Sequence, residues 1–446
     1  MKHIPFKLLS LSLFLSACSG GLSPEMAAVR DYVPRHAVMA HRGSTYWAPE
    51  ETESAWRWAR EMGADYLESD LQCTKDGIIL ANHDEVLTRT SDIAEVFGEE
   101  IPAGRLAFYE SFGFSREDAL AQLERDKAHF RPYYAASYYY AELLQLNAGK
   151  WFNEAFPERA RDGFAEGQTI SALQDQIAYA EGKCLSRDDN GRRILPYALK
   201  PCCEGKTLEE IAATAKEGGK YMEFIAYDFS KAYAEDPAWT GNLPGIYIEF
   251  KEPEVNPEDM EQRVYDILDQ AGWNILTAPA TEKAFYKDGK VQVGLTSGKV
   301  ILQTFSPRSL QRAHKVFGGG LPLCFLLWPP CPEEIPGGNL DTPEGFAAIL
   351  DWAIANGAQI SGPSIGGEPN NYSELDAAWQ ADLVHRKGML NHPYSFDTLE
   401  QMEEHASRGD GYFTNRSELT LQYLVDHGMR TAKVPSAEET LQRIGY

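Results

Sequence analysis

Short apolar segments alternate along the chain with segments of helical periodicity. Apolar positions recur at helical spacing in residues 54–62, where Ala55, Trp58 and Met62 share one face, and also in 346–355 and 419–425. Strands that alternate with helices predict a parallel sheet. Nine segments rich in apolar and β-branched residues are predicted as strands: 36–40, 64–71, 78–81, 246–250, 300–305, 322–327, 359–361, 388–391 and 411–414.

One predicted strand does not fit a regular strand–helix repeat. Only a short segment with the turn sequence Lys75-Asp76-Gly77 separates 64–71 from 78–81, whereas a parallel crossover needs a dozen residues or more. We therefore expect residues 78–83 to run antiparallel to 66–72 as a hairpin arm at the rim. Eight strands remain, so the predicted fold class is α/β, a TIM (β/α)8 barrel with inserted cap segments on the catalytic face.

Two long segments, about 88–168 and 183–240, interrupt the alternation. Both leave the chain where the catalytic-face loops of a barrel would be, so we expect them to form a cap over the site. The predicted organisation is a barrel domain over 36–430, with an N-terminal tether (18–35) before it and a C-terminal tail (431–446) after it.

The chain of 446 residues has a formal net charge of −24. A surface of this sign repels nucleic acid and anionic lipid, so nucleic acid is not expected as a partner. An anionic small molecule would be repelled as well. A site for one therefore needs a local cation, either a metal ion or a few placed Lys and Arg side chains.

The N-terminus predicts export. Basic Lys2 and Lys7 flank an apolar run over 8–15 that is too short to span a bilayer, which takes ~20 residues, but fits a signal peptide over 1–17. The run ends in Leu15-Ser16-Ala17-Cys18, which resembles a bacterial lipobox. That resemblance implies acylation of Cys18 and anchoring of the exported protein to a bacterial membrane; a plain signal peptide is the alternative.

Six further cysteines follow Cys18, and an exported chain can form disulfides. Cys324 and Cys331 flank Trp328-Pro329-Pro330 and are a plausible pair, as are Cys184 and Cys202. No CxxC spacing indicates a zinc site. Cys73 is expected to be buried and reduced.

Two carboxylates give the first chemical signal. Glu68 and Asp70 lie two residues apart on a predicted strand, so both side chains point to one face. Converging carboxylates repel each other unless a cation lies between them, and hard oxygen ligands favour Ca²⁺ or Mg²⁺.

Two histidines are expected near these acids. His41 ends the first strand, and the turn at Asp76-Gly77 returns His83 beside Asp70. Cleavage of a phosphodiester needs one group to deprotonate the nucleophile and another to protonate the leaving alkoxide. A metal ion and Arg42 would offset the charge on the phosphoryl oxygens.

A later strand carries Glu249 and Lys251 on one face. Its other residues are apolar, so inward-facing charges require partners. A third carboxylate and a lysine could complete a site for a metal and a phosphate.

The ordered set of motifs resembles the glycerophosphodiester phosphodiesterase family over nearly the whole exported chain. The motifs are His41-Arg42-Gly43, an acidic-Thr pair after Ala48-Pro49, Glu68-x-Asp70, Thr74-Lys75-Asp76-Gly77, His83-Asp84, Glu249-x-Lys251, Gln303-Thr304-Phe305, Gly362-Pro363, His392-Pro393-Tyr394 and Asp410 to Asn415.

The resemblance implies roles for each candidate residue. His41 and His83 would be the acid/base pair, and Arg42 and Lys251 the phosphate contacts. One divalent cation, Ca²⁺ or Mg²⁺, would be held by three carboxylates: Glu68, Asp70 and Glu249. The implied activity is metal-dependent hydrolysis of glycerophosphodiesters to an alcohol and sn-glycerol 3-phosphate, and a cap is implied after the His-Asp motif.

The chain departs from the family pattern at Glu51, where Asn is usual, at Asn415-Arg416-Ser417, which replaces an acid and a proline, and in the length of the second insertion. We expect none of these departures to involve the candidate site residues.

Two other functions stay open at this point. A lyase-type phosphodiesterase would use the same histidines to give a cyclic phosphate. A surface lipoprotein that only binds a partner would be expected to have lost a histidine or a carboxylate, and this chain has kept them all.

Overall fold

The computed structural model describes residues 21–111, 113–199 and 225–446. The predicted signal peptide and Cys18 lie outside these residues, so export and anchoring stay predictions. Among the described residues, no helix combines the length and the hydropathy needed to span a bilayer.

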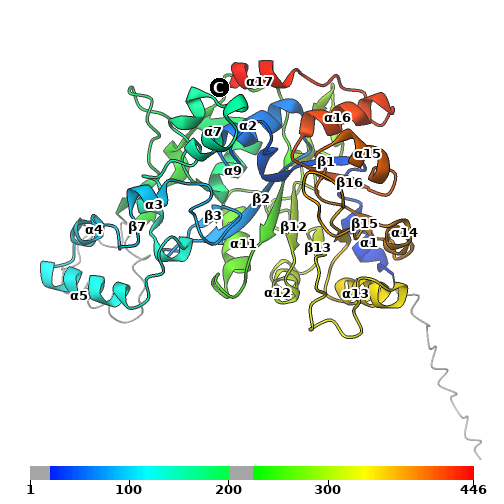
Figure 1. Cartoon of the computed structure of the whole chain (residues 1–446), viewed down its shortest axis with the longest axis horizontal. Coiled ribbons are helices and arrows are strands. Elements are labelled where there is room, and N and C mark those ends of the chain that lie inside the picture. Colours follow the sequence, from blue (N-terminus) through cyan, green and yellow to red (C-terminus); the bar gives the residue numbers. More distant parts are fainter. Residues whose placement is uncertain (1–20, 112, 200–224) are drawn as a thin grey trace, which may run out of the picture.

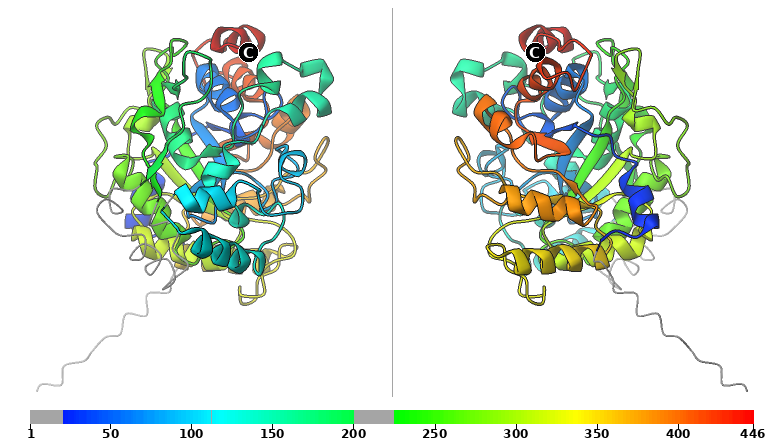
Figure 2. Two further views of the ribbon diagram at one scale, coloured as in Figure 1. Left: turned by 90° about the vertical axis from the view of Figure 1, so that its left-hand side faces the viewer. Right: turned by 90° about the vertical axis from the view of Figure 1, so that its right-hand side faces the viewer.

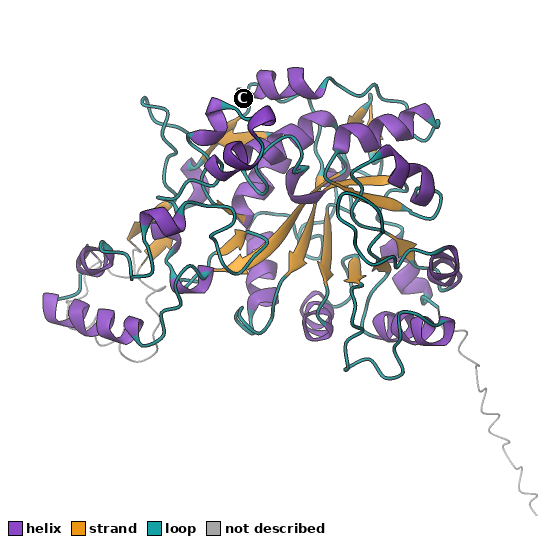
Figure 3. Cartoon of the chain, viewed as in Figure 1, coloured by secondary structure: helices purple, strands orange, loops and turns teal. Residues whose placement is uncertain are grey.

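Parallel strands form the centre of the molecule (Figure 1, Figure 3). They pair with their neighbours in chain order, and backbone hydrogen bonds from Asp410 N–H to Asn391 O and from Phe396 N–H to Phe413 O, both 2.7 Å, link the last strand to the one before it. The predicted (β/α)8 barrel is confirmed. In the described chain its strands are β1 Ala37–Ala40, β2 Tyr66–Cys73, β9 Gly245–Phe250, β12 Val300–Thr304, β13 Leu323–Leu326, β14 Ile360–Gly362, β15 Leu390–Asn391 and β16 Gly411–Thr414.

Helices follow the strands and cover the outside of the barrel (Figure 2). Their apolar faces and the outward side chains of the strands form the larger core, while Met39, Tyr66 and Tyr247 are among the side chains that fill the interior. These helices are α2 Glu53–Met62, α9 Leu173–Ala180, α11 Met260–Gln270, α12 Pro307–Phe317, α13 Pro343–Ala355, α14 Ala378–Arg386, α15 Leu399–His405 and α16 Ser417–Asp426.

The predicted hairpin arm is present. Strand β3 (Ile79–Ala81) pairs antiparallel with β2, with Leu71 opposite Ala81. The short strand β4 (Ser171–Ala172) pairs with the other side of β3. The arm carries the chain back to the rim, where His83 follows.

The described parts of both insertions lie on the β2–β3 side of the barrel (Figure 1). The tyrosines 138–140 are fully buried there, and the backbone of Tyr138 accepts a hydrogen bond from Lys75 N–H. The first insertion contains α3 Ile93–Val96, α4 Arg105–Ser111, α5 Arg116–Lys127, α6 Tyr140–Leu143, α7 Lys150–Ala155 and α8 Asp162–Ala165; the second contains β5 Lys183–Leu185, β6 Tyr197–Leu199, β7 Ile225–Tyr227 and β8 Tyr233–Glu235.

Segments near both ends of the described chain pack on the barrel, and a small hairpin follows α11. Within the predicted tether, α1 (Pro24–Arg30) is held by a hydrogen bond from Arg30 to the carbonyl of Gly388. Within the predicted tail, α17 (Ala437–Ile444) lies against α2, where Trp58 donates to the Ala437 carbonyl. The hairpin consists of β10 (Tyr286–Lys287) and β11 (Lys290–Val291).

The predicted disulfide between Cys324 and Cys331 is wrong, since both are free thiols. Cys324 lies on β13 and points into the barrel interior, while Cys331 lies in the following loop, next to Gly338 and against the outer core. The two side chains therefore lie in different layers of the barrel. Cys73 is free and buried, as expected; Cys202 lies outside the described residues, so the second pairing stays a prediction.

Candidate active site

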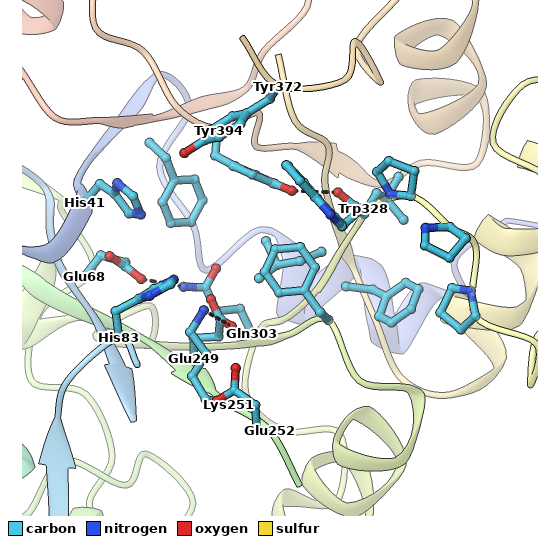
Figure 4. A pocket seen from close by; sticks show the side chains of 18 of the residues that line it. His41, Glu68, His83, Glu249, Lys251, Glu252, Gln303, Trp328, Tyr372 and Tyr394 are labelled. Carbon is cyan, nitrogen blue, oxygen red and sulfur yellow. Dashed lines mark hydrogen bonds and ion pairs between the residues drawn. The ribbon is translucent and has the colours of Figure 1, made fainter. Parts of the chain in front are cut away.

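A cavity of about 720 Å³ opens at the carboxyl ends of the barrel strands (Figure 4). All of the candidate residues except Asp70 line it, and Asp70 is buried beneath them. Among the described residues of the two insertions, only Arg89, at the start of the first, contributes to its wall. The described parts of the insertions beyond Arg89 therefore stand beside the site and do not cap it as predicted, and the strand ends with their own loops form most of its wall.

The His-Arg-Gly turn after β1 is a short 3-10 turn, His41–Gly43. Arg42 and Gly43 have left-handed backbones, with φ of 49° and 86°. A Cβ on Gly43 would lie 2.6 Å from Cβ of Ala55 on α2, so only glycine fits this turn. The turn brings His41 and Arg42 to the cavity, and Arg42 N–H donates to Glu68 Oε2 at 2.7 Å.

Three carboxylates converge at the charged end of this cavity. The parallel register of β2 and β9 sets Asp70 opposite Glu249, and oxygen atoms of Glu68, Asp70 and Glu249 lie within 4.8 Å of one another. Lys251 Nζ lies 2.8 Å from Glu249 Oε1 and 3.3 Å from Asp70 Oδ1. Arg42 Nε lies 2.8 Å from Asp70 Oδ2. The predicted ligand set and both predicted phosphate contacts are therefore neighbours in the fold.

The electrostatics of the three carboxylates favour a bound cation. Burial, and then the charge of Asp70, raise the pKa of Glu68 well above its usual range. The pKa of Glu249 is raised to about 8. Burial and the repulsion of Asp70 raise this pKa, and the attraction of Lys251 offsets them only in part. For Asp70 the attraction of Lys251 and Arg42 outweighs burial, and its pKa is lowered. A divalent cation between these oxygens would relieve the repulsion.

The atoms present also fit a hard cation. Asp70 Oδ2 is buried and accepts no hydrogen bond, since the nearby Arg42 Nε–H is not aligned with it. Gln303 Oε1 is also buried and accepts no hydrogen bond. Gln303 lies on β12 and donates from Nε2 to Glu68 Oε1 at 2.9 Å. Buried oxygens without a donor are unfavourable unless another partner binds them. The oxygen-only set is that of Ca²⁺ or Mg²⁺.

The two histidines lie at the same end of the cavity, on either side of Glu68 in Figure 4. Asn415 Oδ1 lies 2.7 Å from His41 Nδ1. An amide oxygen only accepts, so Nδ1 carries the hydrogen and the lone pair of Nε2 is free. Burial, followed by the charge of Arg42, lowers the pKa of His41 to about 3, so this imidazole is neutral at pH 7.

His83 has a different partner. Its Nδ1 lies 2.5 Å from Asp84 Oδ1, and Arg89 donates to the other oxygen of Asp84 at 2.6 Å. Arg89 also makes a bidentate pair with Glu50 at 2.7 and 2.9 Å. Hydrogen bonds from His83 and Arg89 outweigh burial and lower the pKa of Asp84. The ionised Asp84 accepts the Nδ1 hydrogen of His83, which leaves Nε2 for a second partner.

The expectation that the departures avoid the site residues was wrong. Glu51 Oε1 accepts the backbone N–H of Asp70 at 2.7 Å, and Asn415 holds His41. Sequence reasoning also assigned no role to Gln303, Arg89 or Glu50. Gln303 could have been found, because it is a polar residue near the carboxyl end of an apolar strand, the position where barrel enzymes carry their chemistry.

Comparison with known proteins points to the same activity as the motifs and the site geometry. Residues 41–189, which include both histidines, Glu68 and Asp70, match the model of the glycerophosphoryl diester phosphodiesterase family. Glycerophosphodiester phosphodiesterase of Bacillus subtilis (strain 168) is 24% identical over 408 residues, which cover 91% of this chain and 89% of that protein. Glycerophosphoinositol inositolphosphodiesterase GDPD2 of Mus musculus is 32% identical over 171 residues, 37% of this chain and 26% of that protein.

A solved structure shares the fold. A protein from Silicibacter pomeroyi, assigned as a glycerophosphoryl diester phosphodiesterase, superposes with a TM-score of 0.53 at 15% identity, and the match covers 91% of this chain and 98% of that one. The family match, the relative that spans nearly the whole chain and the shared barrel confirm the resemblance seen in the motifs. Residues 41–189 thus match the glycerophosphodiester phosphodiesterase family, and nearly the whole chain is similar to an enzyme that is named for this activity.

Proposed function

We propose that this enzyme hydrolyses glycerophosphodiesters to an alcohol and sn-glycerol 3-phosphate, with one divalent cation and two histidines as acid and base. One observation carries the proposal: the carboxylates that fit a cation and two differently supported histidines converge at one end of a single cavity. Either group alone could be structural, but together they supply what phosphodiester cleavage requires.

The residues that would hold the cation are Glu68, Asp70 and Glu249. When bound there, Ca²⁺ or Mg²⁺ would neutralise charge on the phosphoryl oxygens and so favour attack on phosphorus. Arg42 and Lys251 already lie against the same carboxylates, and we assign them to the phosphoryl oxygens as well.

The partners of the two histidines suggest which one is the base. His41 is neutral and has a free Nε2, so it can take a proton from the attacking water. His83 is held through Nδ1 by Asp84, and we assign it as the acid that gives a proton to the leaving alkoxide. In the balanced step, the oxygen of water bonds to phosphorus, the bond from phosphorus to the leaving alcohol breaks, and one proton passes through each histidine.

The product decides between hydrolysis and the lyase-type reaction. We expect glycerophosphocholine, glycerophosphoethanolamine and related diesters to give a phosphomonoester in ³¹P NMR spectra when Ca²⁺ or Mg²⁺ is present, and no reaction in chelator. A cyclic phosphate as the final product would show that the reaction is of the lyase type and not a hydrolysis. Binding without turnover of any diester in either metal would favour a binding lipoprotein.

The role of Asn415 can be tested through pH. Asn415→Asp puts a carboxylate against His41 Nδ1, which stabilises the imidazolium and raises the pKa of His41. A base must be unprotonated, so we expect the acid limb of the kcat/KM profile to move to higher pH, with activity lost first below neutrality. The matched control is Asn190→Asp on the exposed surface. An unchanged acid limb would exclude His41 as the base.

A further inference from the structure

The two ends of the cavity differ sharply in character (Figure 4). The acidic, basic and amide side chains all belong to the part of the chain up to Gln303. The later part of the wall contains no charged side chain among the described residues; it consists of Phe305, Phe325, Leu326, Leu327, Trp328, Pro329, Pro330, Cys331, Pro332, Leu340, Ile349, Tyr372, Tyr394 and Phe413. We call this later part the apolar crevice.

The apolar crevice offers few hydrogen bonds to a ligand. Pro329, Pro330 and Pro332 have no N–H. The hydroxyl of Tyr394, one of the few polar side chains there, already donates to the Leu327 carbonyl at 2.7 Å. A polar alcohol placed here would lose its hydrogen bonds to water without replacement, which is unfavourable.

The wall of the apolar crevice is aliphatic as well as aromatic. Trp328 stands at the rim with 43% of its surface exposed and its ring edge-on to Tyr372 at 5.3 Å. Leu340 and Ile349 are 7% and 1% exposed and also line the cavity. A small alcohol such as glycerol or choline would leave this aliphatic part empty.

We infer that the enzyme accepts glycerophosphodiesters that carry one hydrocarbon chain, with the phosphodiester at the charged end and the chain in the apolar crevice. This inference rests on the proposed function, because it uses the same reaction. Water attacks phosphorus, the bond from phosphorus to the headgroup alcohol breaks, and the alkoxide takes a proton. The products are the alcohol and a glycerol phosphate monoester that keeps its chain.

A hydrocarbon occupant fits better than a quaternary ammonium. The rings of Phe305, Tyr394, Tyr372 and Trp328 follow one another at centroid distances of 5.8, 6.1 and 5.3 Å, and such rings could attract a cation. The side chains of Leu327, Leu340 and Ile349, which line the same apolar crevice, could not attract a cation. A hydrocarbon chain is the ligand that gains from contact with both.

Chain length is the direct test of the inference. Choline release would be measured from glycerophosphocholine and from its butanoyl, hexanoyl and octanoyl monoesters at submicellar concentrations, using full-length protein in saturating Ca²⁺ or Mg²⁺. We expect kcat/KM to rise by about fourfold per buried methylene until the apolar crevice is filled. No rise with chain length, while glycerophosphocholine itself is cleaved, would overturn the inference and leave the proposed function intact.

Two variants locate the effect in the apolar crevice. Leu340→Asp and Trp328→Ala should lower the octanoyl-to-unacylated ratio of kcat/KM by at least about tenfold, since each removes contacts with several methylenes. The controls are Leu399→Asp and Trp239→Ala, at side chains that are 50% and 38% exposed outside the cavity. The ratio is the readout because a poorly folded variant loses both rates together.

The remaining outcomes are also decisive. If a folded Trp328→Ala variant keeps the wild-type octanoyl-to-unacylated ratio of kcat/KM, the acyl chain binds elsewhere and the inference is overturned. A preference for choline over ethanolamine and glycerol headgroups without any gain from acyl chains would make the apolar crevice a cation site, which also overturns it. If none of the diesters is cleaved with either metal, the proposed function is wrong, and the inference is wrong with it.

Discussion

Glu68→Gln and Asp70→Asn are expected to abolish phosphodiesterase activity and the thermal stabilisation that Ca²⁺ or Mg²⁺ gives the wild-type protein. Each change keeps the side-chain shape but removes one ligand charge from the three carboxylates, whose oxygens lie within 4.8 Å. A ligand at a hundred times its Kd stabilises a fold by about 2.7 kcal/mol, so the loss is measurable. Melting curves with and without metal, and assays with each metal restored, test this.

The metal-free proteins give an independent reading. Because burial and the charge of Asp70 disfavour the ionised form of Glu68, Glu68→Gln should not lower the melting temperature in chelator. Asp70→Asn should lower it, since Asp70 pairs with Arg42 and Lys251. Glu254→Gln, at a carboxylate that is 69% exposed, should behave as wild type in every assay. Full activity of Glu68→Gln or Asp70→Asn in chelator would show that no metal is needed at this site.

His41→Ala and His83→Ala are each expected to lower kcat by at least ~10²-fold with little change in folding, since a positioned acid or base contributes ~10²–10⁴-fold. The two variants should differ on a nitrophenyl phosphodiester, whose leaving group needs no proton. That substrate should rescue His83→Ala, the variant without the acid, but not His41→Ala. Steady-state kinetics on both substrates measure the difference.

His129→Ala serves as the control, because His129 is exposed in the first insertion, away from the cavity. Rescue of His41→Ala instead of His83→Ala would exchange the two roles. Near-normal rates of both variants on the natural diester would end the two-histidine mechanism and favour a binding protein.

Much of the fold could be predicted because its signals are local. The strand-sized apolar segments predict the barrel strands, and Lys75-Asp76-Gly77 predicts the turn into β3, since a turn needs only neighbouring residues. The acids followed from the same logic: alternation along β2 puts Glu68 and Asp70 on one face whatever the strand pairs with.

Other features depended on contacts between distant segments. Asn415 holds His41 across 374 positions in the sequence, and Arg89 links Asp84 to Glu50. No local pattern states that these residues meet. The predicted disulfide failed for the same reason, because seven residues of spacing do not say that Cys324 points inward while Cys331 stays outside.

The sequence by itself determined the barrel, the hairpin arm and the candidate site residues, because periodicity and motifs are patterns over a few residues at a time. Only the tertiary structure decided which side chain holds each histidine, which carboxylate oxygen lacks a donor and where the described parts of the insertions lie. It also decided that Trp328, Leu340 and Ile349 line one cavity with the charged end. Closure of the barrel joins loops from distant strands at one rim, and side-chain environment is a property of that closed packing.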